Sequence, residues 1–348
     1  MGNTINKAEP GWQDRVRKRK KAIITATAFV VVGILLLVLF FAAINIGSLQ
    51  VSFGQLWKGL FVEYDKNVAT IYDLRFPRIF ISMLAGAAIA VSGVLFQAVL
   101  KNPLADPGII GISSGAGFAA VLVTAFAPGL YLMVPLFAFI GGVAAFALVY
   151  CLSWKGGLSP LRIILTGVAV NAFFTGLSSA FNSMSGGNMS GVASIVEGNI
   201  TQKTWDDVHM LVWYVIAGLF LACLFMAECN LLTLEDKTAK SLGFNVNVSR
   251  VIISLIAVLL ASISTAVAGA ISFLGLIVPH IGRILVGSDH RKLIPFSGLA
   301  GAFTFLWADT IGRTIAAPYE VSAAVVMSVV GGPFFILLLR RSRKYADH

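Results

Sequence analysis

The sequence is divided into long uncharged runs of about 20 residues, the length an α-helix needs to cross roughly 30 Å of hydrocarbon. Short clusters of charges separate these runs, and only 12% of the 348 residues are charged. An average soluble domain has about a quarter. The pattern predicts an all-α polytopic membrane protein with about ten transmembrane helices. The expected spans lie near residues 22–45, 77–100, 108–127, 131–152, 161–182, 208–227, 250–270, 272–287, 294–312 and 320–339.

One apolar region, residues 251–287, is too long to be a single span. As one helix it would extend roughly 55 Å at 1.5 Å per residue, which is more than a bilayer accommodates by tilting. We therefore expect a break, for which Gly269, Gly275 and Pro279 are the available residues.

The basic residues indicate which side of the membrane each loop occupies. An even number of spans places both termini on one side, and with cytoplasmic termini only six of the 26 basic residues fall outside: Lys58, Lys66, Arg75, Arg78, Lys203 and Arg313. We expect a basic cytoplasmic segment at 1–21, a ten-helix domain at 22–339 and a basic cytoplasmic tail at 340–348. The net charge of +10 then reflects topology in the cell membrane and attraction to anionic lipid. Nucleic-acid binding is not expected.

The sequence predicts neither catalytic residues nor a metal site. The four histidines are scattered without the spacing of a zinc site, and the three cysteines have no metal-ligand spacing. The motif G-x-x-x-x-G-K-[ST] occurs nowhere, so the chain has no phosphate-binding loop of the Walker type. We expect no cofactor on this chain.

Two other functional classes have candidate residues. A proton-coupled secondary transporter would need Asp309, Glu320 or His280 as a relay. An intramembrane hydrolase would need a pair such as Ser272 and His280, but no G-x-S-x-G setting surrounds them. Asp309 has a simpler interpretation, because Arg313 lies four residues later and an i,i+4 ion pair would lower the cost of burying both.

A polar stripe runs along the fifth expected span. Asn171, Thr175, Ser178 and Asn182 recur at intervals of four, three and four, on one face of an otherwise apolar helix. Such groups face either another helix or water. The stripe is therefore a candidate lining of a translocation path, with hydrogen bonding between helices as the alternative.

Three motifs give the chain a family resemblance. They are RFPRIFISMLAGAAIAVSGVLFQAVLKNPLADPGIIGISSGAG from Arg75 to Gly117, GAISFLGLIVPHIGRILVGSDHR from Gly269 to Arg291, and ADTIGR from Ala308 to Arg313. The chain resembles the permease subunit of the iron-siderophore and vitamin B12 class of ATP-binding-cassette (ABC) importers, over nearly its whole length from the second span onward. In one departure, Glu235 stands where the family pattern has glycine.

The resemblance implies a ten-helix subunit that works with several partners. These are a second permease subunit, identical or closely related, an extracellular substrate-binding protein, and two cytoplasmic ATPase subunits that bind the ATP and Mg²⁺. An iron(III)-siderophore is the expected cargo, with vitamin B12 or haem as alternatives.

The resemblance also implies roles for particular residues. Arg75, Arg78 and Arg313 would dock acidic groups of the binding protein; without the resemblance, the first two could equally be headgroup anchors. The segment 231–246 would be the coupling region that contacts an ATPase subunit, and its alternative is an amphipathic helix on the membrane surface. The expected coupling residues are Leu234, Glu235, Asp236, Ala239, Leu242, Gly243 and Phe244. The polar stripe would line the path at the subunit interface.

Overall fold

The structure is a computed structural model that describes residues 10–46, 51–153, 160–184 and 190–346, and these residues form helices and loops without strands. Ten described helices match the expected spans: α1 (Pro10–Asn45), α4 (Phe76–Val99), α5 (Ile112–Phe126), α6 (Val134–Ser153), α7 (Pro160–Met184), α9 (Trp205–Leu224), α12 (Val246–Ala268), α13 (Leu274–Val286), α14 (His290–Thr314) and α15 (Ala323–Ala346). Shorter helices connect them: α2 (Phe53–Phe61), α3 (Lys66–Leu74), η1 (Pro128–Met133), α8 (Ser190–Glu197), α10 (Met226–Leu232) and α11 (Asp236–Ser241).

By length and hydropathy alone, six helical stretches of the described chain could each cross a membrane. They are Arg19–Asn45, Lys66–Val99, Pro128–Ser153, Arg162–Met184, Trp205–Leu224 and Val246–Ala268. Helices α5, α13 and the apolar part of α15 are shorter, and α14 carries charged residues near both ends. The basic segments expected at the two chain ends are largely helical. Helix α1 begins at Pro10, within the first of them, and α15 continues to Ala346, within the second.

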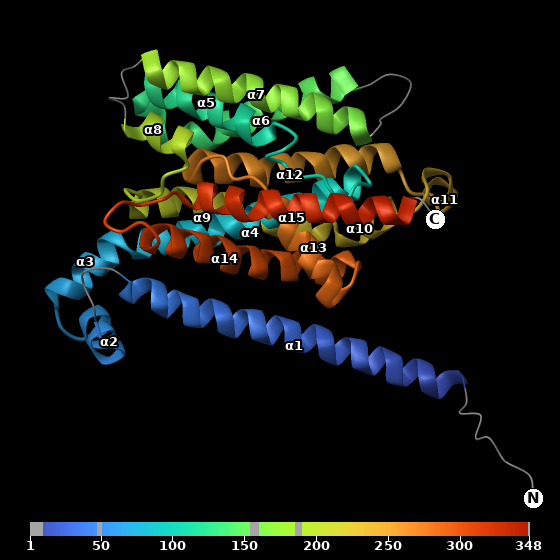
Figure 1. Cartoon of the computed structure of the whole chain (residues 1–348), viewed down its shortest axis with the longest axis horizontal. Coiled ribbons are helices and arrows are strands. Elements are labelled where there is room, and N and C mark those ends of the chain that lie inside the picture. The colour runs from blue at the N-terminus through green and yellow to red at the C-terminus, as the bar shows by residue number, and fades with distance from the viewer. Residues whose placement is uncertain (1–9, 47–50, 154–159, 185–189, 347–348) are drawn as a thin grey trace, which may run out of the picture.

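The helices lie roughly parallel in a flat bundle (Figure 1). Helix α1 runs along one edge, and α5, α6 and α7 form the opposite edge. The start of α1, the end of α15 and the short helix α11 lie at one end of the bundle, whereas α2, α3 and α8 lie at the other (Figure 1). This arrangement agrees with cytoplasmic termini, and we call the two ends cytoplasmic and outer.

Helix α4 is the centre of the bundle. Of its 24 residues 20 are buried, and it packs against α9, α12, α13 and α14. The packing brings backbones into direct contact: a Cβ atom on Gly86 would lie 2.3 Å from the carbonyl oxygen of Gly301, and one on Gly93 would lie 2.0 Å from that of Gly275. Only glycine allows helices to approach this closely.

The expected break lies between α12 and α13. Helix α12 ends at Ala268, and Gly269 follows with a φ of 77°, a left-handed conformation that glycine adopts readily. Gly275 and Pro279, the other residues available for the break, lie inside α13. Helix α13 has 13 residues, about 20 Å at 1.5 Å per residue, so it is too short to cross roughly 30 Å of hydrocarbon by itself.

The contact between Gly93 and Gly275 predicts a strong effect of a single methyl group. We expect Gly93→Ala to lower the free energy of unfolding by about 1–3 kcal/mol, the usual range for overpacking, because the methyl would meet backbone atoms. Gly33→Ala in α1 is the matched control, since a Cβ there would have no neighbour within 4 Å. Thermal unfolding of both purified variants measures the difference, and equal stability would contradict the packing argument.

Candidate functional site

An outer charge cluster forms where α4, α14 and the loop before α15 meet. We define it as Arg75, Arg78, Asp309, Arg313 and Glu320. Arg78 donates from Nε and Nη2 to Oδ1 of Asp309, at 2.9 and 2.8 Å, and from Nη1 to Oε2 of Glu320 at 2.8 Å. The Arg78 side chain is 7% exposed and that of Asp309 is fully buried. Burial of this arginine is therefore compensated by two carboxylates, of which Asp309 accepts from two of its nitrogens.

Two arginines of the cluster also hold the outer end of α1. Arg75 donates from Nη1 to the carbonyl oxygen of Ile44, and Arg313 donates from Nη2 to that of Ala43 at 3.3 Å. Both carbonyls belong to the last turn of α1, where backbone oxygens have no partner within the helix. Cations at this position are also favoured by the helix dipole. The arginines thus fasten α1 to α4 and α14.

The structure brings together the three arginines expected to dock the binding protein, but not as an open positive surface. Arg313 lies in the expected i,i+4 relation to Asp309, with Nε 3.6 Å from Oδ2, and its side chain is only 8% exposed. Arg75 is less buried than the other two arginines. Two contacts of the cluster were not predicted from the sequence. Glu320 accepts from Arg78, 242 residues away, and Thr201 donates to Glu320 at 2.7 Å.

The expected coupling region contains the six-residue helix α11 at the cytoplasmic end. Its N-cap position is Glu235, and Gly243 follows the helix with a φ of 78°. Ala239 is buried, whereas Leu234 and Leu242 are exposed and Phe244 is half-buried. The apolar residues of the segment are therefore divided between a buried and an exposed side.

Asp236 ties α11 to the rest of the bundle. Its Oδ1 accepts hydrogen bonds from Lys101 Nζ at 2.8 Å and from Arg250 Nη2 at 2.9 Å. Lys101 Nζ also donates to the carbonyl oxygen of Leu234. The hydrogen bond from Lys101, followed by that from Arg250, holds the pKa of the Asp236 carboxyl below its usual value, so these ion pairs persist at neutral pH.

The polar stripe lies on α7, at the edge of the bundle (Figure 1). Thr175 is exposed, Asn171 and Asn182 are half-buried, and Ser178 is buried with its Oγ donating to the carbonyl oxygen of Phe174 at 2.9 Å. The four residues thus differ in exposure within this subunit.

A cavity of about 440 Å³ lies beside α15. Its lining comes from the end of α8, the break after α12 and one side of α15: Val196, Glu197, Ala270, Val325, Ser328 and Val329. This cavity was not predictable from the sequence, because the segments that line it are distant in sequence and carry no recognisable motif.

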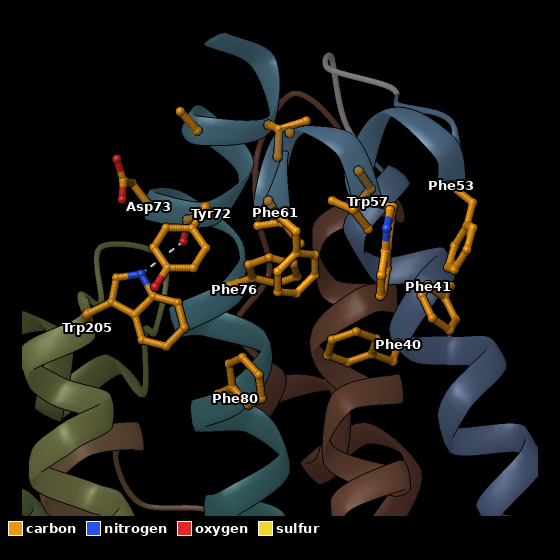
Figure 2. Close-up of a pocket in the computed structure, with 15 residues that line it drawn as sticks. Phe40, Phe41, Phe53, Trp57, Phe61, Tyr72, Asp73, Phe76, Phe80 and Trp205 are labelled. Carbon is orange, nitrogen blue, oxygen red and sulfur yellow. Dashed lines mark hydrogen bonds between the residues drawn. The ribbon is translucent and has the colours of Figure 1, made fainter. Parts of the chain in front are cut away.

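A second cavity, of about 740 Å³, lies at the outer end beneath α2 and α3. Figure 2 shows its aromatic lining, which comes from α1, α2, α3, α4 and α9: Phe40, Phe41, Phe53, Trp57, Phe61, Tyr72, Phe76, Phe80 and Trp205. Trp205 closes one side by donating from Nε1 to the carbonyl oxygen of Tyr72 at 3.1 Å. This aromatic pocket is at the α1 edge of the bundle, away from the polar stripe on α7.

Comparison with known proteins connects this architecture to a family of transporters. The chain is 38% identical to the probable heme-iron transport system permease protein IsdF of Staphylococcus aureus strains bovine RF122 / ET3-1 and Newman, over 94% of this chain and 98% of theirs. It also resembles the solved inward-facing structure of an ABC transporter of the metal-chelate type, with a TM-score of 0.75, 26% identity and coverage of 91% of this chain and 99% of that one.

The fold has a more distant match in PsaBC from Streptococcus pneumoniae in complex with Fab. There the TM-score is 0.55 and the identity 18%, with 82% of this chain and 95% of that chain covered. The model of the FecCD transport family matches residues 35–341. The chain therefore belongs to the FecCD transport family and is a multi-pass membrane permease subunit of an ABC importer, whose ATP is bound by partner ATPase subunits.

Proposed function

We propose that the chain is the permease subunit of a haem importer. The observation that carries this proposal is the 38% identity, over nearly the whole length, to permeases named for heme-iron transport. It favours haem, one of the alternatives left open by the sequence, over the iron(III)-siderophore that was expected first.

The surfaces available to a path fit such a cargo. Between Arg162 and Met184, α7 has no charged residue, and neither does α15 between Ala323 and Leu338. Exposed apolar side chains on these helices include Phe173 and Val329. Haem is a planar apolar ring with two carboxylate arms, so an uncharged wall would let the ring pass without trapping it.

The path itself is proposed to lie between this subunit and a second permease subunit. Asn171, Thr175, Ser178 and Asn182 on α7 would contribute its polar groups, and the cavity beside α15 would be part of its outer section. Exposure of uncharged faces on α7 and α15 supports this arrangement, because in a membrane such faces meet lipid or another subunit.

The cargo is tested by reconstituting the permease with its ATPase subunits and binding protein in proteoliposomes. We expect ATP-dependent uptake of haem that continues when the proton gradient is collapsed, because ATP hydrolysis drives it. Ferric siderophore and vitamin B12 are the comparison cargoes. Saturable uptake of either one without uptake of haem would refute the proposal.

We further propose that the binding protein docks through acidic groups above the outer charge cluster. The cluster contains three arginines and two carboxylates, which leaves one excess positive charge, and Arg75 is its least buried arginine. Arg78 is a poor position for a test. Reversing its charge would bring three carboxylates together and disturb the fold.

Arg75→Glu is expected to weaken docking at least about fivefold, since one exposed pair contributes roughly 1 kcal/mol or less and reversal adds repulsion. The difference in docking affinity between Arg75→Glu and the parent should shrink as salt rises, because exposed charges are screened over about 8 Å at physiological ionic strength. Arg75→Lys is the matched control, which keeps the charge and a donor for Ile44. Affinity measured across a salt series decides; unchanged binding of Arg75→Glu would exclude docking at this arginine.

For the coupling region, we propose that the exposed side of residues 231–246 contacts an ATPase subunit. Leu242 is the most exposed large apolar residue of the segment, at 66%. Leu234 of the same segment is also exposed, so this cytoplasmic surface presents apolar side chains among charged residues. Glu235, Asp236, Gly243 and Phe244 would shape this surface, and Ala239 would pack it against the bundle.

Leu242→Asp should cost the contact about 1–3 kcal/mol, because a charge would be buried without a partner. The ATPase subunits should then be lost on purification. Val248→Asp is the control: Val248 is also exposed, at 51%, but lies outside the segment. Co-purification of the ATPase subunits with both variants alike would exclude Leu242 from the contact.

A further inference from the structure

The turn between α4 and α5 contacts the coupling region directly. Lys101, just after α4, bonds both Asp236 and the carbonyl oxygen of Leu234. The exposed fractions of the Lys101 and Asp236 side chains are 32% and 43%, so the pair lies at the surface of the cytoplasmic end. The Lys101 side chain therefore joins the turn to both a side chain and a backbone carbonyl of the coupling region.

The same turn packs against the break between α12 and α13. Gln97 donates from Nε2 to the carbonyl oxygens of Ala105, in the turn, and Gly275, at the start of α13, both at 3.1 Å. A Cβ atom on Gly108 would lie 3.0 Å from the carbonyl oxygen of Ile271. The turn thus packs directly against backbone atoms of the break.

The break in turn forms part of the cavity beside α15. Ala270 lines that cavity. The preceding Gly269 packs against α8's end, where a Cβ atom on it would lie 2.4 Å from Cα of Gly198. A continuous series of contacts therefore runs from the coupling region through the turn and the break to the cavity wall.

We propose that Lys101 is a positioning residue that transmits movement of the coupling region to the wall of the translocation path. The inference rests on the proposed function, in which residues 231–246 contact an ATPase subunit. Displacement of α11 would pull Lys101 through Asp236 and Leu234, and the turn would carry the displacement to residues 269–275.

The backbone of Lys101 supports a role for its side chain. Lys101 has a φ of 49°, a left-handed conformation. Among the described residues other than glycine, only Phe273 also has a positive φ. Glycine would adopt this conformation without steric cost. The turn geometry alone therefore does not explain a lysine here, whereas its two bonds to the coupling region do.

Lys101→Met tests the proposal without leaving a carboxylate unpaired, because Arg250 still bonds Asp236. The complete complex, with ATPase subunits and loaded binding protein, is reconstituted in proteoliposomes, and cargo transported is measured per ATP hydrolysed. We expect Lys101→Met to lower this ratio at least about twofold, the lower range for a residue that carries coupling between sites. The ATPase subunits should remain bound and active.

Two variants serve as controls. Lys101→Arg should restore the ratio of the parent, because it keeps the charge and the donors. Lys292→Met removes another exposed cytoplasmic lysine, in the first turn of α14, and should leave the ratio unchanged.

The proposal is overturned if Lys101→Met keeps the parent ratio, if Lys292→Met lowers it equally, or if Lys101→Met simply loses the ATPase subunits. Failure of the proposed cargo gives a different result: the parent complex would then transport no haem. In that case the ratio is measured with whichever comparison cargo the parent transports.

Discussion

The direct backbone contact of α4 with α13 and α14 is the constraint on which the rest of this bundle depends. A helix surrounded by four others can be close-packed only if small residues occupy the crossing points, and Gly86 and Gly93 occupy them here. Such a helix of 24 residues, about 36 Å long at 1.5 Å per residue, cannot bend or rotate freely. Its two ends therefore have fixed positions relative to each other.

At the outer end of α4, the interaction that matters most is the pairing of Arg78 with Asp309. Removing one partner from a buried pair typically costs about 3–5 kcal/mol, because the other charge is left unpaired. Glu320 and the carbonyl oxygens of α1 extend this pairing into a network that joins α1, α4, α14 and the loop before α15. The arginines that first suggested docking are thus also structural, and any docking surface must be built on top of them.

Much of the architecture was predictable because membrane topology follows from local composition. Apolar runs and the bias of basic residues give the spans and their sides, and Gly269 marked the break. Partners such as Arg78 and Glu320 were not predictable, since they are 242 residues apart and meet only when the loop before α15 lies against the outer end of α4. The same holds for Lys101 and Asp236, which are 135 residues apart.

The fixed geometry of α4 has a thermodynamic consequence for the importer. Arg75, next to its outer end, is part of the proposed docking surface, and Lys101, next to its cytoplasmic end, contacts the coupling region. If both contacts change strength between the same two conformations, linkage requires the effects to be reciprocal. Nucleotide binding that weakens docking by a given factor must be matched by docking that weakens nucleotide binding equally. A rigid helix that connects the two sites is a sufficient physical route for such coupling, because both ends must move together.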